Sequence, residues 1–211
     1  MSLERGFTVF PVTGIPELRA GDDLAELIAA RVELEQNDIV VVAQKAISKV
    51  EGRVVRVRAP LVICETRHGF ICASAGVDQS NTPEAGTLVL LPLDPDGSAA
   101  RLRDELRART ERDVGVLISD SFGRPWRQGT TDVAIGASGV EVLRELSGEV
   151  DPVGYELKAT VIAVADELAG AAQLVAGKLD RVPVVIVRGL AMPGEGKATD
   201  IPIPPERDLF G

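Results

Sequence analysis

The stretch Val114–Gly129 constrains the fold of this chain most, because it joins an apolar strand directly to a polar and cationic segment. Its first five residues, V-G-V-L-I, carry no charge, which predicts a strand buried inside a sheet. Ser119, Asp120 and Ser121 follow at once, and then a glycine, two arginines, a proline and the only tryptophan. Asp and Ser also favour turns, because their side chains bond nearby backbone N–H groups. The stretch therefore predicts either a ligand site at a strand end or a simple strand cap.

Other apolar strands are also followed by polar side chains at their carboxyl ends. The residues in these positions are Gln44 and Lys49, Asp78 and Asn81, Asp120 and Ser121, and Arg188. Two separated carboxylates can hold a hard divalent cation, and Lys49, Arg124 and Arg127 could neutralise a phosphate or a carboxylate. Each position also has an ordinary structural explanation, such as a turn made by Asp78 with Asn81.

The order of the expected elements predicts an α+β fold with a mixed β-sheet core, flanking helices and two intertwined lobes. The predicted strands are Phe7–Val12, Ile39–Val42, a hairpin of 60–64 with 69–73, Thr87–Leu91, Val114–Ile118, Tyr155–Val164 and Val182–Val187. Three helices are predicted: one with Asp22 as its N-cap, one from Ser98 to about Arg112, and one from Leu168 to Lys178 that follows Asp166 and Glu167. No glycine-rich phosphate loop or dinucleotide fingerprint is present, so P-loop and Rossmann folds are not supported. The 211 residues suit a single unit, 1–211, or two sub-lobes with the glycine-rich 129–160 region packed against the rest.

Composition excludes several classes of function. The net charge of −9 argues against nucleic-acid or anionic-membrane partners, which require a basic face. The apolar runs are too short to span a bilayer and no leader is evident, so a cytoplasmic protein is expected. Cys64 and Cys72 are expected to face each other in the hairpin as reduced thiols. The single histidine, His68, falls in a predicted turn, which excludes a Ser-His-Asp triad and favours transfer chemistry run by a metal ion and by positioning.

Seven motifs, in this order, resemble the coenzyme F-420-0:L-glutamate ligase family over nearly the whole chain. They are F-P-V-T-G-I-P at Phe10–Pro16, I-S-K-V-E-G-R at Ile47–Arg53, A-G-V-D-Q-S-N at Ala75–Asn81, L-P-L-D-P-D-G-S at Leu91–Ser98, I-S-D-S-F-G-R-P-W-R at Ile118–Arg127, V-A-D-E-L-A at Val164–Ala169 and V-V-I-V-R-G-L at Val184–Leu190. Each motif alone is weak, whereas the ordered set is specific.

The resemblance implies a GTP-dependent ligase that adds L-glutamate in γ linkage to the deazaflavin coenzyme F-420-0 through an acyl phosphate. It implies Mg²⁺ or Mn²⁺, with K⁺ as an optional further ion, and a homodimer with its site in a cleft. By position, the metal ligands would be Asp78, Asp120 and Ser121, and the nucleotide would meet Ile15, Pro16, Glu17, Leu18, Gln44, Lys49 and Asn81. Asp120, Lys49 and Arg124 are expected to carry the chemistry, because metal and cationic groups stabilise the charge that grows during phosphoryl transfer.

Two departures from the family pattern leave alternatives open. Only Val54–Ala59 connects Gly52-Arg53 to the following strand, where family members carry a longer segment. This difference concerns the binding of the acceptor more than the binding of the nucleotide. Lys178 stands where some relatives place a carboxylate near a second metal, and a cation there would meet phosphate instead. A non-catalytic nucleotide- or deazaflavin-binding homologue, and an amide ligase for a different acceptor acid, are the competing hypotheses.

Overall fold

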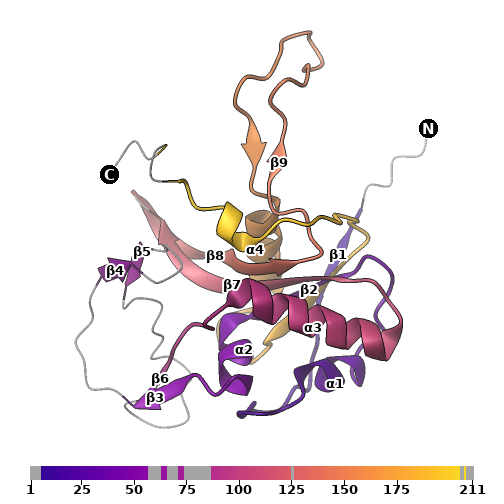
Figure 1. The fold of residues 1–211 in the computed structure, drawn as a ribbon, viewed down its shortest axis with the longest axis vertical. Coiled ribbons are helices and arrows are strands. Elements are labelled where there is room, and N and C mark those ends of the chain that lie inside the picture. Colours follow the sequence, from indigo (N-terminus) through magenta and orange to yellow (C-terminus); the bar gives the residue numbers. More distant parts are fainter. Residues whose placement is uncertain are drawn as a thin grey trace.

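A five-stranded mixed sheet forms the centre of the computed structural model, which describes residues 6–56, 63–65, 71–73, 87–124, 126–204 and 207. The strand order is β1 (Thr8–Pro11), β11 (Val184–Arg188), β2 (Ile39–Ala43), β7 (Gly115–Arg124) and β8 (Arg127–Ser138). Figure 1 shows this sheet between α4 on one side and α3 on the other. The uncharged runs of β2, β7 and β11 occupy the three inner positions, where both faces of a strand are covered. The predicted α+β class with a mixed sheet is confirmed, whereas the division into lobes stays a prediction.

Strand direction decides which strand ends meet. β2 and β7 are parallel, with Ala43 opposite Ser119, and β11 is antiparallel to both β1 and β2. The carboxyl ends of β1, β2 and β7 therefore lie at one edge of the sheet. Arg188 ends β11 and so lies at the opposite edge, away from the polar residues that follow β2 and β7.

Helices cover both faces of the sheet. On one face, α1 (Leu24–Ala29), α2 (Gln44–Val50) and α3 (Pro95–Thr110) enclose an apolar cluster. On the other, α4 (Val164–Ala176) and the short helix η2 (Ala198–Asp200) enclose a second cluster. Leu102 and Leu106 of α3 are buried, and their spacing of four residues places them on one face of the helix.

Two helix starts differ from the prediction because a neighbouring aspartate provides the cap. Asp23, and not Asp22, accepts a hydrogen bond from the Glu26 N–H at 2.9 Å, so α1 begins one residue later than expected. Asp94, and not Ser98, accepts from the Gly97 N–H at 2.9 Å, and α3 therefore already begins at Pro95. The fourth helix also begins earlier than expected, at Val164, but its N-cap is Ala163, which makes no side-chain cap.

Among the described residues, three two-stranded sheets lie outside the central one. β3 (Val54–Arg56) pairs with β6 (Thr87–Val89), and β4 (Ile63–Glu65) pairs with β5 (Ile71–Ala73) with Cys64 opposite Cys72, which confirms the predicted hairpin pairing. β9 (Arg144–Glu145) pairs with β10 (Val161–Ile162), so the long strand predicted for Tyr155–Val164 is wrong except at these two residues. None of the described helices has the length and apolar character that a membrane crossing needs.

The hairpin of β7 and β8 corrects the prediction for the central motif. The strand does not end at Ile118, because β8 pairs with it as far as Arg124. Ile118 faces Gly136 while Ser119 faces Ala134, which leaves Ile135 as the extra residue of a β-bulge. Ser119, Asp120 and Ser121 thus belong to a paired strand, and the simple strand cap is excluded.

Gly136 packs directly against the start of α3. A Cβ atom at this position would lie 2.5 Å from the Pro95 carbonyl oxygen, a backbone atom that cannot move aside alone. We expect Gly136→Ala to lower the free energy of unfolding by about 1–3 kcal/mol, the usual cost of overpacking, as measured by denaturant titration. Gly123→Ala is the matched control in β7, because its Cβ would meet nothing within 4 Å. Equal losses in both variants would contradict the proposed clash.

Candidate functional site

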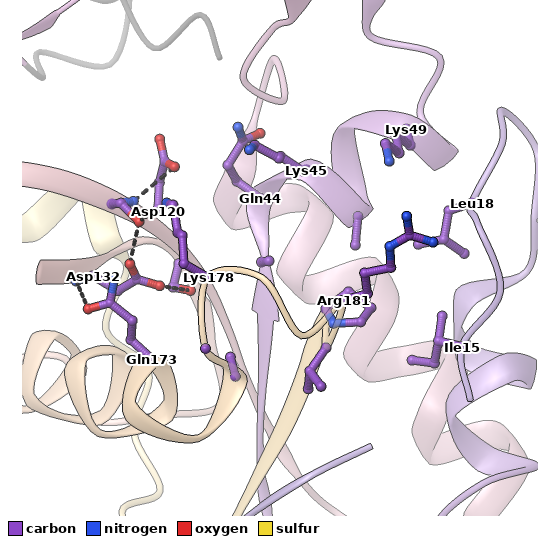
Figure 2. A pocket seen from close by; sticks show the side chains of 18 of the residues that line it. Ile15, Leu18, Gln44, Lys45, Lys49, Asp120, Asp132, Gln173, Lys178 and Arg181 are labelled. Carbon is purple, nitrogen blue, oxygen red and sulfur yellow. Dashed lines mark hydrogen bonds between the residues drawn. The ribbon is translucent and has the colours of Figure 1, made fainter. Parts of the chain in front are cut away.

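A cleft of about 810 Å³ opens at the edge where the carboxyl ends of β1, β2 and β7 meet. Three segments far apart in the sequence line it: Ile15–Leu18 after β1, residues 44–46 with Lys49 of α2, and Ser119–Ser121 of β7. The end of α4 and the loop before β11 complete the wall. Figure 2 shows Asp120, Asp132, Gln173 and Lys178 on one side of the cleft and Ile15, Leu18 and Lys49 on the other.

The cleft is richer in cationic groups than the rest of this acidic protein. Its lining contains Lys45, Lys49, Lys178 and Arg181 against Glu17, Asp120 and Asp132. The whole chain, in contrast, carries a net charge of −9. A concave site with a local excess of positive charge attracts an anionic ligand.

Lys49 is held in place by the loop after β1. Its Nζ lies 2.5 Å from Glu17 Oε1, and the lysine side chain is only 12% exposed whereas that of Glu17 is 61% exposed. An ammonium group has three N–H donors, so this ion pair leaves further donors for a ligand. The contact joins α2 to the loop after β1 on one side of the cleft (Figure 2).

Gln44 presents an unsatisfied buried donor. Its side chain is buried, and its Oε1 accepts a hydrogen bond from the Ser48 hydroxyl at 2.8 Å. Within the described residues, its Nε2 has no hydrogen-bond partner. Because an unmet buried donor costs free energy, and because Gln44 lines the cleft, an oxygen atom of a ligand would satisfy it.

Asp132 organises the wall formed by the β7–β8 hairpin. Its Oδ1 accepts from the Ser121 hydroxyl at 2.6 Å and its Oδ2 from the Ser119 hydroxyl at 3.2 Å. Lys178 Nζ donates to the Ser121 hydroxyl at 2.9 Å, and the Asp132 N–H donates to Gln173 Oε1 at 3.2 Å. These contacts connect both strands of the hairpin to the end of α4.

The oxygen donors on this wall suit a hard divalent cation that binds together with phosphate. Asp120 Oδ1 accepts from the Ser121 N–H at 2.9 Å, and carboxylate and hydroxyl oxygens are the ligand types that Mg²⁺ and Mn²⁺ prefer. No cluster of three or more acidic, histidine or cysteine residues that could hold a metal occurs among the described residues. Mg²⁺ needs only one or two protein carboxylates when phosphate oxygens and water supply the rest, so the residues present fit such an ion.

The structure brings most of the predicted site residues into this one cleft. Those that line it are Ile15, Pro16, Glu17, Leu18, Gln44, Lys49, Asp120 and Ser121. Arg124 does not line it: this residue is exposed near the hairpin tip, where its guanidinium donates to the Gln128 carbonyl at 3.3 Å, because the strand continues past Ser121. Asp78 and Asn81 lie outside the described residues. The roles of all these residues stay predictions.

Several lining residues were missed by the sequence reasoning, and Asp132 is the most important of them. In the sequence it lies 11 residues beyond Ser121, with no pattern that marks it. Only the hairpin register, which places Ser121 opposite Asp132, brings the two together. Lys45, Gln173 and Arg181 reach the cleft through helix and loop positions that carry no local signal either.

Asp166 fixes the bulge beneath this wall. Its Oδ1 accepts from the Ala134 N–H at 2.9 Å, and burial raises the pKa of its carboxyl, partly offset by that hydrogen bond. The folded state therefore disfavours the ionised form, and the contribution of Asp166 to stability is lost as pH rises through its raised pKa.

The effect of Asp166→Asn on the free energy of unfolding is expected to become more favourable as pH increases. Asparagine keeps the acceptor oxygen for Ala134 but never ionises, so its free energy of unfolding relative to wild type should increase from about pH 3 to pH 7. Denaturant titrations at the two pH values measure this difference. A difference that is constant with pH would contradict the prediction.

Comparison with known proteins identifies close relatives. A family model described as F420-0:Gamma-glutamyl ligase matches residues 14–59 and 56–189. A protein named coenzyme F420:L-glutamate ligase from Methanopyrus kandleri is 42% identical, with 95% of this chain and 96% of the relative covered. Proteins of the same name from Archaeoglobus fulgidus and Methanothermobacter thermautotrophicus are 39% and 36% identical, covering 96% and 97% of this chain and 95% and 99% of theirs.

These alignments also bear on the short connection after Arg53. They extend over 236 to 250 positions, whereas this chain has 211 residues, so the relatives carry residues that this chain lacks. The family match is divided into two segments that meet at residues 56–59. The division falls on the predicted short connection, 54–59.

Proposed function

The chain belongs to the F420-0:Gamma-glutamyl ligase family, and we propose that it is a ligase that joins L-glutamate in γ linkage to a deazaflavin coenzyme with GTP as co-substrate. The observation that supports this most is the single cleft at the carboxyl ends of β1, β2 and β7. It gathers Lys49, Gln44 and Asp120, residues that the family resemblance assigns to the nucleotide and the metal. We also propose that the chain acts in the cytoplasm.

In the proposed reaction, the γ-phosphoryl group of GTP passes to the terminal carboxylate of the acceptor, giving GDP and an acyl phosphate. The amine of glutamate then attacks the acyl carbon, an amide bond forms, and inorganic phosphate and a proton leave. Lys49, anchored by Glu17, would bind phosphate oxygens, and the Gln44 Nε2 would donate to a ligand oxygen. Such fixed donors stabilise charge that develops in the transition state without reorganising first.

Asp120 and the Ser121 hydroxyl would hold the divalent cation. Bound there, Mg²⁺ or Mn²⁺ would neutralise the phosphate oxygens during transfer. Ser121 keeps one lone pair for this purpose after its bonds to Asp132 and Lys178, which supports the assignment. A role for K⁺ is a further part of the proposal and rests on the family resemblance alone.

The proposal is tested by incubating the protein with GTP, L-glutamate, the deazaflavin acceptor and Mg²⁺ or Mn²⁺. Formation of the γ-glutamylated product, detected by mass spectrometry, together with GDP release is expected. Nucleotide binding by calorimetry without any product, under either metal, would instead support the non-catalytic homologue. Product formed only with a different acceptor acid, in a panel of carboxylates, would indicate a ligase of another specificity.

We further propose that the protein is a homodimer. Figure 1 shows the segment between β9 and β10 projecting away from the body of the molecule. Its tip exposes Val150, Val153 and Tyr155, apolar side chains that a second copy could cover. A molar mass of two chains by light scattering is expected, with dissociation in Tyr155→Glu; a monomeric wild-type protein would overturn this part.

A further inference from the structure

The Ser121 hydroxyl has its only proton committed. It donates to Asp132 Oδ1 at 2.6 Å and accepts from Lys178 Nζ at 2.9 Å. A hydroxyl has one donor and two lone pairs, so one lone pair is all that remains for a ligand. Ser121 can therefore receive a cation or an N–H group, but it cannot donate to a phosphate oxygen while Asp132 holds its proton.

Lys178 is a group on this wall that can bind an anion. Its Nζ has three N–H donors, and among the described residues only one of them is used, on Ser121. Within the described part of the chain, no carboxylate lies within ion-pair distance of the Lys178 ammonium. The Asp132 carboxylate belongs to the same network, but the Ser121 hydroxyl stands between the two charged groups. Lys178 follows directly after Gly177, the C-cap of α4, so its backbone is fixed by the helix end while its side chain returns to the cleft.

The Ser121 hydroxyl lies between two groups of opposite charge, Asp132 and Lys178. We expect a cation to bind on the carboxylate side of this network and an anion to bind at the ammonium. Asp132 fixes the direction of the Ser121 proton, and this turns a lone pair toward Lys178 and holds the ammonium over the cleft wall. Asp120 and Lys178 both line the cleft and lie on the same side of it in Figure 2, so the proposed cation site and the ammonium face one ligand space. A phosphoryl group has enough oxygens to contact the cation and the ammonium at the same time. An ammonium group is compact and lacks the planar paired donors of arginine, so it has no preference for the geometry of a carboxylate.

We propose that Lys178 binds an oxygen of the terminal, transferable phosphoryl group of the nucleotide, and that Asp132 is a positioning residue that acts on Lys178 through Ser121. This inference rests on the proposed function, because it assigns a ligand atom within the same cleft. It predicts that Lys178 discriminates a nucleoside triphosphate from the diphosphate, because only the triphosphate carries the terminal group.

Calorimetry with Lys178→Met tests the assignment directly. Affinity for a non-hydrolysable GTP analogue with Mg²⁺ should fall about tenfold or more, the value of one charge-assisted hydrogen bond, while affinity for GDP should change less than about twofold. Lys178→Arg, which keeps the charge, should restore most of the affinity. Lys158→Met, an exposed lysine on the projecting segment, is the matched control and should bind both nucleotides as wild type does.

Kinetics separate the positioning role of Asp132 from a structural one. Asp132→Asn can keep hydrogen bonds to both serines but loses the charge that orients them, so kcat should fall while KM for glutamate is unchanged and the melting temperature is retained.

Equal loss of GTP-analogue and GDP affinity in Lys178→Met, or no loss, would overturn the assignment. A raised KM for glutamate or acceptor with unchanged nucleotide affinity would overturn it also, because Lys178 would then bind a carboxylate. Wild-type turnover in the same assays keeps these outcomes distinct from a failure of the proposed function.

Discussion

Replacing Asp120 with asparagine is expected to reduce the rate of glutamylation by about a hundredfold to a thousandfold while the protein stays folded. Asparagine has nearly the same shape, and its Oδ1 can still accept from the Ser121 N–H, which Asp120 does at 2.9 Å. The variant loses only the negative charge, on which divalent-cation affinity and the stabilisation of transferring phosphate depend. Initial rates at saturating GTP and metal, together with a thermal melt, measure both effects.

The control for this variant is Asp104→Asn, which removes an equal charge from the exposed side of α3. It should leave rate and melting temperature unchanged. Asp120 is half-buried and is not part of either apolar cluster, so unfolding of Asp120→Asn would show that the residue is structural. Full activity of a folded Asp120→Asn would also contradict the proposed cation site.

Arg188→Ala is expected to cause the largest loss of stability among the single substitutions considered, about 3–5 kcal/mol. Arg188 donates to both carboxylate oxygens of Asp38, at 2.9 and 2.7 Å, and Asp38 is only 1% exposed. This pairing raises the pKa of Arg188, and its guanidinium also lies 5.1 Å from the centre of the Phe10 ring. Alanine would leave a buried carboxylate without its counter-charge. Denaturant titration measures the loss.

Two further variants separate burial from charge. Arg101→Ala removes an exposed ion pair with Glu51, in which the arginine side chain is 61% exposed, and it should cost less than about 1 kcal/mol. Arg188→Lys keeps the charge but not the paired donors and should fall between these values. Because Arg188 lies at the edge opposite the cleft, the folded Arg188→Lys protein should keep wild-type KM for GTP. A loss in Arg101→Ala equal to that in Arg188→Ala would contradict the role assigned to burial.

The sequence predicted the inner strands well because burial on both faces leaves a local trace. Ile39–Val42, Val114–Ile118 and Val182–Val187 contain no charge, and these runs correspond to β2, β7 and β11. Helix starts were less accurate, since adjacent polar residues such as Asp22 and Asp23 compete for one capping position. Which of them caps depends on backbone geometry and not on residue type alone.

Polar residues after apolar strands also identified most of the cleft. Gln44, Lys49, Asp120 and Ser121 all line it, because β2 and β7 run parallel and end at the same edge. Arg188 also follows an apolar strand but lies at the opposite edge of the sheet, because β11 runs antiparallel to β2. An apolar run has the same composition whether the strand is parallel or antiparallel to its neighbour, so the sequence alone does not separate the two cases.

By itself, the amino-acid sequence determined which segments are buried, which residues follow them, and to which family the chain belongs. Only the tertiary structure decided which strand ends share an edge, that the β7 strand continues through Ser121, and that Asp132 and Lys178 meet there. The physical reason is that strand direction and register are fixed by hydrogen bonds and packing between segments distant along the chain. Such contacts leave no periodic pattern in the residues that make them.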